Sequence, residues 1–325
     1  MIAALPNPIP LHDIEAARVR TAQAALRTPL IKLNTENAAA EIYLKLENLQ
    51  PIGCFKIRGA SNAMLLAPED ERRAGVYTAS AGNMAQGVAW CARQLGIRCD
   101  VVVPDHAPRA KLDAIERLGA QVVKVPFDRW WEILVQHRFD ELSGHFIHPV
   151  SDARVIAGNG VIGIEILEDL PDVDAIVVPY GGGGLSSGIA SAVQALRPQT
   201  RVYGCEVETA APLAASFAAG RPMSIDYQPS FVDGIGGKTL LAEMWPLVST
   251  LLAGALTVSL DEVAAAIRLL ALRNHLIAEG AGAASVAAAL RGIADARKIV
   301  CVVSGGNINM STLAKILADE DRPAH

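Results

Sequence analysis

Four consecutive glycines give the clearest sign of chemistry in the sequence. In VVPYGGGGLSSGIASAV, a β-branched run leads into Gly181, Gly182, Gly183 and Gly184 and then into a segment of helical character. The N–H groups of glycines have no side chains in front of them, and the following helix N-terminus adds its dipole, so this arrangement suits a phosphate group. A crowded turn is the alternative, but four glycines lose more conformational entropy on folding than a simple turn requires. The stretch therefore predicts a phosphate-binding loop.

Two common phosphate motifs do not fit this part of the chain. The dinucleotide fingerprint G-x-G-x-x-G would need glycine at Ser186 or at Ser187. Glu206 at the end of the next predicted strand still resembles the acid that binds a ribose, so a nicotinamide-dependent oxidoreductase stays open as an alternative. GGKT at 236–239 imitates a P-loop, but Val232 stands where the first glycine is required.

A loop that holds one phosphate raises the question of a cofactor with one phosphate. Pyridoxal phosphate is such a cofactor, and it needs a lysine for its Schiff base. Lys56 follows a predicted strand and a Pro-Ile-Gly turn, and it lies beside Phe55. Apolar surroundings would lower the pKa of its amine and favour imine formation, although a lysine exposed at the surface is the alternative. Lys111, Lys298 and Lys315 are expected on the solvated surface.

Two further turns carry polar groups. The stretch TASAGNMAQ ends a predicted strand at Ser80, Gly82 and Asn83, and SGGN at 304–307 follows another strand with Ser304. Such residues cap helices, and the same N–H groups and side chains can bind a substrate carboxylate. Because ligands in parallel sheets bind at the carboxyl ends of the strands, these turns and the glycines are expected to converge.

The elements that must position these turns alternate between strands and helices. Strands are predicted at 42–47, 76–79, 99–104, 121–125, 174–180, 201–208 and 298–306, and helices at 85–95, 109–118, 153–167, 185–196 and 260–275. Nearly continuous apolar strands alternating with helices indicate an α/β protein with parallel-rich sheets covered on both faces. We expect two lobes, with residues 1–73 and 149–325 forming a large cofactor-binding domain and residues 74–148 a small domain.

The composition of the 325-residue chain excludes several classes of protein. With 51% hydrophobic and 19% charged residues it is typical of a globular protein, and its formal net charge of −5 disfavours a nucleic-acid partner. The uncharged runs at 175–196 and 245–260 are interrupted or flanked by proline or are too short, so no membrane span is predicted. Five cysteines without a CxxC pair, and no signal peptide, predict a cytoplasmic protein without a cysteine metal site.

Four motifs in this order resemble a known family. GCFKIRGA around Lys56, SAGNMAQ at 80–86, PYGGGGL and SGGN are similar to the fold-type II pyridoxal-phosphate enzymes of the serine/threonine dehydratase and serine racemase group, over nearly the whole chain. The resemblance implies that Lys56 forms the Schiff base and then removes the Cα proton of the substrate. It implies a small-molecule amino-acid substrate and a homodimer or homotetramer.

The same resemblance assigns roles to the other residues. Gly181, Gly182, Gly183 and Gly184, with the Leu185 amide, would hold the phosphate. Around the cofactor ring, Phe55 would lie close, Asn83 would meet the phenolic oxygen and Ser304 the pyridine nitrogen. Ser80, Gly82, Asn83 and Met84 would bind the substrate. A hydroxyl at Ser304 leaves the pyridine nitrogen unprotonated, and such a weaker electron sink favours β-elimination.

Departures from the family pattern narrow the expected activity. Ala81 stands where racemases have a second serine as the acid on the opposite face, so poor racemisation is expected. Met84 and Val150 replace more polar or aromatic residues, which indicates either a side pocket for a larger β-substituent or a simple repacking of the wall. Pro212 replaces an aspartate of the metal-binding relatives, which share Glu206, so no metal is predicted.

The implied activity is elimination of water from a 3-hydroxy L-amino acid such as threonine, serine or 3-phenylserine, giving a 2-oxo acid and ammonia. A serine racemase-like enzyme is the alternative on the same scaffold. Two alternatives come from different classes of protein. One is the nicotinamide-dependent oxidoreductase, and the other is a regulatory protein that binds phosphate but catalyses no reaction.

Overall fold

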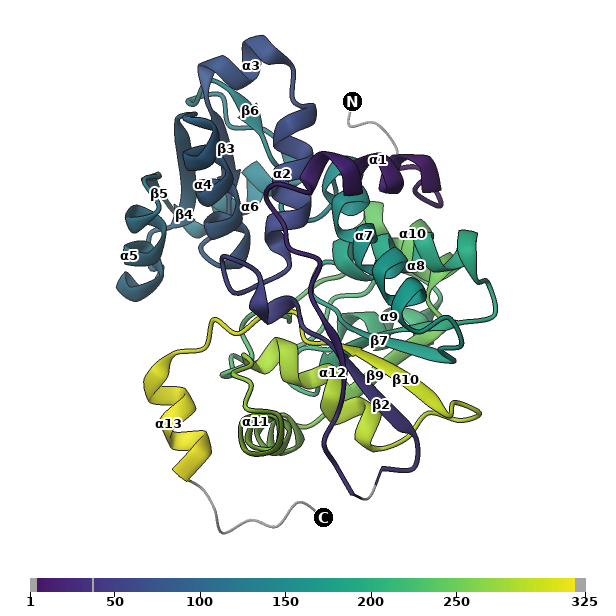
Figure 1. Ribbon diagram of the computed structural model, residues 1–325. Coiled ribbons are helices and arrows are strands. Elements are labelled where there is room, and N and C mark those ends of the chain that lie inside the picture. The colour runs from purple at the N-terminus through teal and green to yellow at the C-terminus, as the bar shows by residue number, and fades with distance from the viewer. Residues whose placement is uncertain (1–4, 37, 319–325) are drawn as a thin grey trace.

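Two β-sheets organise the computed structural model, which describes residues 5–36 and 38–318 (Figure 1). The larger sheet has the strand order β1-β2-β10-β7-β8-β9, and all its neighbours are parallel except β1 and β2. Its strands are β1 (Leu30–Lys32), β2 (Glu41–Lys45), β7 (Ala175–Pro179), β8 (Arg201–Val207), β9 (Gly254–Val258) and β10 (Lys298–Val302). The predicted parallel-rich α/β class is therefore confirmed.

The smaller sheet is parallel throughout and has the strand order β5-β4-β3-β6. Its strands are β3 (Val76–Ala79), β4 (Cys99–Pro104), β5 (Gln121–Val125) and β6 (His145–Phe146). All four strands fall within residues 74–148, the segment predicted to be the small domain. The exact boundaries between the two domains stay a prediction.

Helices cover both faces of the larger sheet because side chains alternate along its strands. On β10, Ile299 and Cys301 pack with residues of α11 (Leu260–Asn274) and α12 (Gly280–Leu290). Val300 and Val302 face the other way, into a core shared with α7 (Ala153–Asp169) and α8 (Gly184–Leu196). Strands buried on both faces explain the nearly continuous apolar runs of the sequence.

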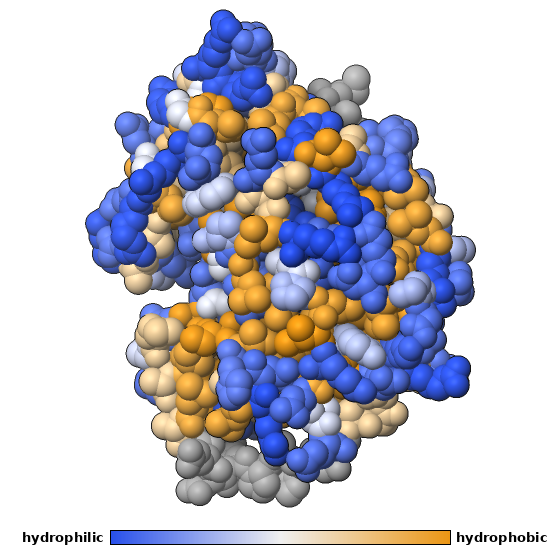
Figure 2. Space-filling view, viewed as in Figure 1, coloured by the Kyte–Doolittle hydropathy of each residue, from blue (hydrophilic) through white to orange (hydrophobic). Residues whose placement is uncertain are grey.

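The remaining helices complete the two halves and connect them. α2 (Lys56–Leu66) packs against both α7 and α4 (Asn83–Leu95), so it joins the layers of the larger and smaller sheets. The other helices are α1 (Leu11–Thr21), α3 (Glu69–Ala74), α5 (Arg109–Arg117), α6 (Phe127–Gln136), α9 (Pro212–Ala219), α10 (Trp245–Leu251) and α13 (Met310–Ala318). In the space-filling view, an indentation at the left edge separates the part with α5 from the part with α13 (Figure 2).

Sequence patterns missed several of these elements. The strand predicted at 298–306 ends at Val302, because the chain then turns through Ser304 into a loop. The sequence patterns did not predict the short strands β1 and β6 or the strand β9. They also did not predict several of the helices. Among them α12 is buried along almost its whole length and consists of Ala, Gly, Ser, Val and Leu, so it has no polar face to reveal a helical period. Of the helices in the described part of the chain, none is long and apolar enough to cross a membrane.

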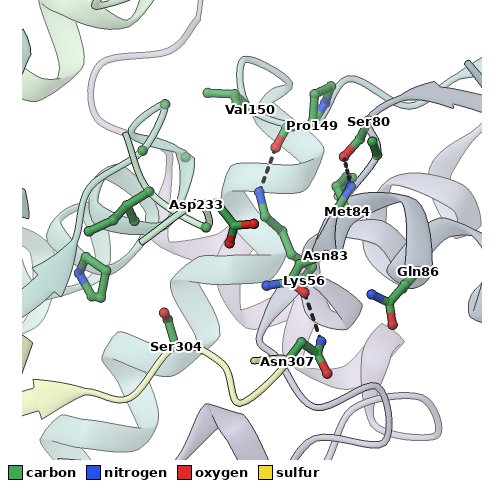
Figure 3. Close-up of a pocket in the computed structure, with 18 of the residues that line it drawn as sticks. Lys56, Ser80, Asn83, Met84, Gln86, Pro149, Val150, Asp233, Ser304 and Asn307 are labelled. Carbon is green, nitrogen blue, oxygen red and sulfur yellow. Dashed lines mark hydrogen bonds between the residues drawn. The ribbon is translucent and has the colours of Figure 1, made fainter. Parts of the chain in front are cut away.

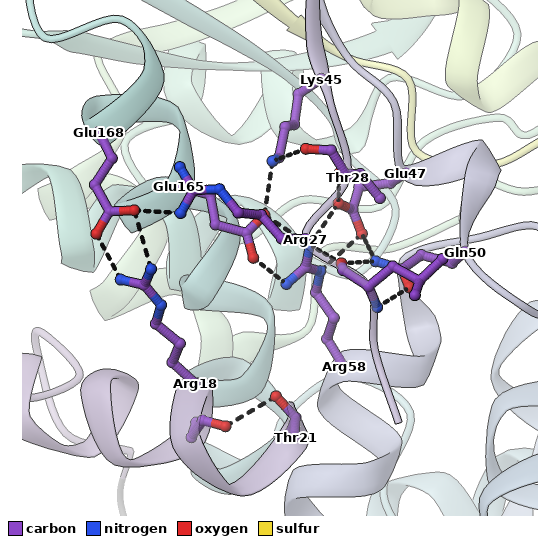
Figure 4. A network of polar contacts seen from close by, with 12 residues as sticks. Arg18, Thr21, Arg27, Thr28, Lys45, Glu47, Gln50, Arg58, Glu165 and Glu168 are labelled. Carbon is purple, nitrogen blue, oxygen red and sulfur yellow. Dashed lines mark hydrogen bonds and ion pairs between the residues drawn. The ribbon is translucent and has the colours of Figure 1, made fainter. Parts of the chain in front are cut away.

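A buried network of charges fixes α2 in its place (Figure 4). Arg58 on α2 pairs with Glu47 at 2.8 Å and with Glu165 on α7 at 2.8 Å. Lys45 on β2 pairs with the same Glu165 at 2.6 Å. Two cations thus face two anions inside the protein, and deletion of one member would leave an unpaired buried charge, at a cost of about 3–5 kcal/mol. The network therefore holds the first turn of α2, where Lys56 lies, relative to both β2 and α7.

Candidate active site

A cavity of about 530 Å³ lies where strands of both sheets end. The turns after β3, β4, β7 and β10 contribute to its wall, as the rule for parallel sheets requires. It brings together every residue that the sequence analysis assigned to the site. These residues are Phe55, Lys56, Ser80, Gly82, Asn83, Met84, Gly181, Gly182, Gly183, Gly184, Leu185 and Ser304. Their individual roles remain predictions.

Lys56 is the first residue of α2, and its amine lies inside the cavity (Figure 3). The Nζ atom donates a hydrogen bond to the Pro149 carbonyl at 3.1 Å and lies 5.0 Å from the centre of the Phe55 ring. Burial lowers the pKa of the amine to about 8, although the nearby Cys54 and Glu279 act in the opposite direction. A larger share of the amine is therefore uncharged near neutral pH than for an ordinary lysine, and the uncharged form is the nucleophile.

The glycine loop runs from the end of β7 into the first turn of α8. Gly183 has φ +96°, a conformation that side chains rarely adopt, and a Cβ atom at Gly182 would lie 2.5 Å from the Val150 side chain. The first helical hydrogen bond of α8 runs from the Ser187 N–H to the Gly183 carbonyl. The amide groups just before Ser187 have no partner within the helix, so they form a cradle for an anion.

The turn after β3 is held by a short chain of hydrogen bonds. The Gly82 N–H donates to Ser80 Oγ at 3.2 Å. Asn83, the first residue of α4, donates from Nδ2 to Glu279 Oε1 at 2.8 Å and accepts from Asn307 Nδ2 at 2.8 Å. The helix N-terminus and the amide of Asn83 are thus fixed at the cavity wall, which suits a carboxylate. Ser304 is buried, and its hydroxyl points into the cavity from the chain after β10 (Figure 3).

Several residues of this wall could not be recognised from the sequence. Glu279, just before α12, is buried, and burial raises its pKa to about 7. A glutamate before an Ala/Gly-rich stretch has the pattern of a helix start, so nothing in the sequence marked it as a site residue. Lys111 was expected on the solvated surface, and its side chain is partly exposed there, but it also lines the cavity and pairs with Asp233 at 2.7 Å. Phe127 and Trp130 of α6 also line the cavity.

The residues present fit pyridoxal phosphate. The cradle at Gly181–Gly184 is open to one anionic group, and the reactive amine of Lys56 lines the same cavity. This combination matches the two demands of the cofactor, a phosphate site and a Schiff-base lysine.

Glu206 does not face this cavity but caps a helix. Its carboxylate accepts hydrogen bonds from the N–H groups of Leu213 and Ala214, at 2.8 and 2.9 Å, in the first turn of α9. Burial raises its pKa to about 7. In the described part of the chain, no group of three or more His, Cys, Asp or Glu side chains is arranged to hold a metal ion.

Comparison with known proteins identifies the family. A family described as pyridoxal-phosphate dependent enzyme matches residues 21–305. The chain belongs to this family. An L-threonine ammonia-lyase of Thermotoga maritima is 41% identical over 315 residues, covering 95% of this chain and 78% of the relative. A catabolic L-threonine dehydratase of Escherichia coli (strain K12) is 39% identical, covering 95% of this chain and 96% of the relative. The serine racemase structure of Dictyostelium discoideum has a TM-score of 0.84 at 33% identity, covering 92% of this chain and 99% of that chain.

The predicted membership in the fold-type II pyridoxal-phosphate enzymes is therefore confirmed, and the cofactor is pyridoxal 5′-phosphate. The protein is a pyridoxal-phosphate dependent lyase. The alternative of a nicotinamide-dependent oxidoreductase is set aside. Both dehydratases and racemases share this fold, so the substrate has to be inferred from the site.

Proposed function

We propose that this enzyme removes water from a 3-hydroxy L-amino acid and releases a 2-oxo acid and ammonia. The observation that carries the proposal is the Lys56 amine, whose pKa is lowered to about 8, in one cavity with the glycine cradle and Ser304. L-Threonine is supported as a substrate by the relatives that act on it, at 41% and 39% identity.

The residues of the cavity divide the work between binding and proton transfer. When bound, the cofactor withdraws electrons from the Cα atom of an attached amino acid. The uncharged Lys56 amine accepts the Cα proton, since burial keeps part of it unprotonated near neutral pH. Ser80, Gly82 and Asn83 at the N-terminus of α4 hold the substrate carboxylate. The proton that Lys56 takes from Cα balances the proton with which the leaving hydroxyl departs as water. The released enamine tautomerises to an imine, and a water molecule hydrolyses this imine to the 2-oxo acid and ammonia.

The wall beside this carboxylate site supports a substrate with a larger β-substituent. Met84 is buried there, and Val150, Phe127 and Trp130 add apolar surface to the same cavity. Apolar and aromatic walls bind aryl groups better than polar ones. We propose that 3-phenylserine is accepted in addition to threonine, with its phenyl ring against these side chains.

A comparison of two substrates tests this proposal. The value of kcat/KM would be measured for L-threonine and for L-threo-3-phenylserine, with the 2-oxo acid as the product. A value for phenylserine at least as high as for threonine is expected, and a clear preference for threonine would rule out the larger pocket.

In Lys56→Ala, we expect no 2-oxo acid and no borohydride-sensitive visible absorbance. Normal turnover by Lys56→Ala would refute the proposed role of Lys56.

The racemase alternative is tested in the same reactions. Ala81 lines the cavity where a racemase needs a proton donor, and its methyl group cannot supply one. We therefore expect little D-amino acid beside the 2-oxo acid. The homodimer or homotetramer, and the cytoplasmic location, remain predictions from the sequence.

A further inference from the structure

One short segment, residues 148–151, contacts both the reactive amine and the phosphate cradle. It leads from β6 into α7, and its Pro149 carbonyl accepts the hydrogen bond from Lys56 Nζ at 3.1 Å. The side chain of Val150 lies against Gly182, and the Val150 carbonyl lies against Gly184, where added Cβ atoms would come within 2.5 and 2.9 Å. The position of this segment therefore sets the position of two parts of the site at once.

His148 holds the segment through hydrogen bonds to its backbone, and it does not line the cavity. Its ring is buried, and Nδ1 lies 3.1 Å from the Val150 nitrogen and 2.7 Å from the Ser151 nitrogen. Both are backbone N–H donors, so Nδ1 must offer them a lone pair and cannot carry a proton itself. The ring stacks on His137, with ring centres 4.1 Å apart and planes 12° apart.

The surroundings of His148 keep the ring uncharged. Burial lowers its pKa to about 3, and the neighbouring His137 ring and the Lys56 amine act in the same direction. A hydrogen bond to the backbone of Leu134 acts in the opposite direction. The Ser151 hydroxyl lies 3.2 Å from His137 Nε2 and donates to Glu243 at 3.2 Å. Glu243 and Asp152 are the acidic groups that act on His137.

We propose that His148 is a positioning residue for the cofactor site: its Nδ1 atom holds the Val150 and Ser151 amides so that the Pro149 carbonyl meets Lys56 and Val150 closes on the glycine loop. The proposal rests on the proposed role of Lys56, but it does not depend on which amino acid is the substrate.

A matched set of variants separates this role from simple packing. In His148→Asn, the side-chain oxygen takes the place of Nδ1, so the acceptor is kept. In His148→Gln, the amide lies one bond further out, at the position of Nε2. His148→Phe keeps a flat ring for stacking on His137 but has no acceptor. Circular dichroism and thermal unfolding would show which variants fold, and His148→Gln serves if His148→Phe does not.

Three readouts use the cofactor-free protein and therefore do not depend on turnover. The first is the rate of Lys56 acetylation as a function of pH, followed by mass spectrometry. The second is the affinity for inorganic phosphate, a probe of the glycine loop. A third readout is the rate at which the cofactor-free protein forms its Schiff base with added pyridoxal phosphate.

The proposal predicts that His148→Asn resembles the wild type in all three readouts. In folded His148→Gln and His148→Phe, the midpoint of Lys56 acetylation should fall below pH 8, because the ammonium form loses its carbonyl acceptor. Phosphate binding and Schiff-base formation should weaken or slow by about tenfold, as expected for a displaced site. Wild-type behaviour of His148→Gln or His148→Phe would overturn the proposal, and so would an equal defect in folded His148→Asn. Failure of the proposed function is recognised separately, by normal Schiff-base formation in Lys56→Ala.

Discussion

The Lys56 amine shows how strongly the surroundings of one residue set its chemistry. The same side chain in water would be almost fully charged at neutral pH, and its pKa would be near 10.5. Removal of water around the amine lowers this value to about 8, while the Pro149 carbonyl keeps it directed within the cavity. The lowered pKa favours the uncharged nucleophile, which is the form that both imine formation and proton abstraction require.

The first prediction concerns the pH dependence of imine formation. The rate at which pyridoxal phosphate reacts with the cofactor-free protein should rise with pH and level off above about 8, because the neutral amine then predominates. Stopped-flow absorbance at a series of pH values measures this rate. Glu279 favours the charged amine, so the midpoint in Glu279→Gln should lie lower than in the wild type. A midpoint near that of free lysine would contradict the inferred burial.

At the scale of elements, the glycine loop depends on its neighbours in the same way as the Lys56 amine does. It lies where β7, α8 and the segment before α7 meet. Gly182 has no room for a side chain because Val150 occupies that space. The shape of the cradle therefore depends on both the glycine loop and the segment that contains Val150. A larger residue in the loop can be compensated by a smaller residue at Val150.

A double-variant cycle tests this coupling between the elements. Gly182→Ala places a methyl group 2.5 Å from the Val150 side chain, so it should weaken the affinity of the cofactor-free protein for pyridoxal phosphate by about tenfold or more. Val150→Ala removes both clashing methyl groups and leaves only a Cβ atom at 3.1 Å. The double variant should therefore bind more tightly than Gly182→Ala alone. Strictly additive losses, measured by equilibrium titration, would show that the two elements are independent.

Sequence patterns predicted those elements best whose ends carry clear signals. The strands at 76–79, 99–104 and 121–125 match the structure at both ends, since each is a β-branched run between turns. α12 was not predicted, because a helix that is apolar on all sides shows no alternation of apolar and polar residues with the helical period. The convergence of the turns followed from the rule for parallel strands. The parts brought in from far along the chain, such as Glu279 and Asp233, could not be predicted because their contact with the site depends on tertiary packing.

At the scale of the whole molecule, the cavity has walls from both sheets, and one ion pair spans them. Lys111 belongs to α5 beside the smaller sheet, while Asp233 lies in the long connection between β8 and β9 of the larger sheet. Both line the cavity, and their side chains are partly exposed to solvent. This pair therefore forms a contact between the part with the smaller sheet and the part with the larger sheet, on the solvent-exposed side of the cavity.

The third prediction concerns this ion pair. Lys111→Met and Asp233→Asn should each raise KM for the amino-acid substrate by about two- to fivefold, the range expected for an exposed pair. The wild-type KM should also rise with ionic strength, whereas that of either variant should not. Steady-state kinetics at low and high salt would measure both effects. The charge-reversed protein, Lys111→Asp with Asp233→Lys, should recover much of the loss, and no recovery would show that the pair does not act by its charge.

The place of β10 between β2 and β7 has a consequence for the order in which the newly made chain can fold. The strands of the smaller sheet follow one another between residues 76 and 146, so that sheet can assemble while the ribosome is still at work. β2 is made early, but its inner neighbour β10 emerges only after β7, β8 and β9. Until then the larger sheet exists as two separate parts with open edges, which are templates for aggregation. Damage to β10 should accordingly appear first as a poor yield of the protein during synthesis.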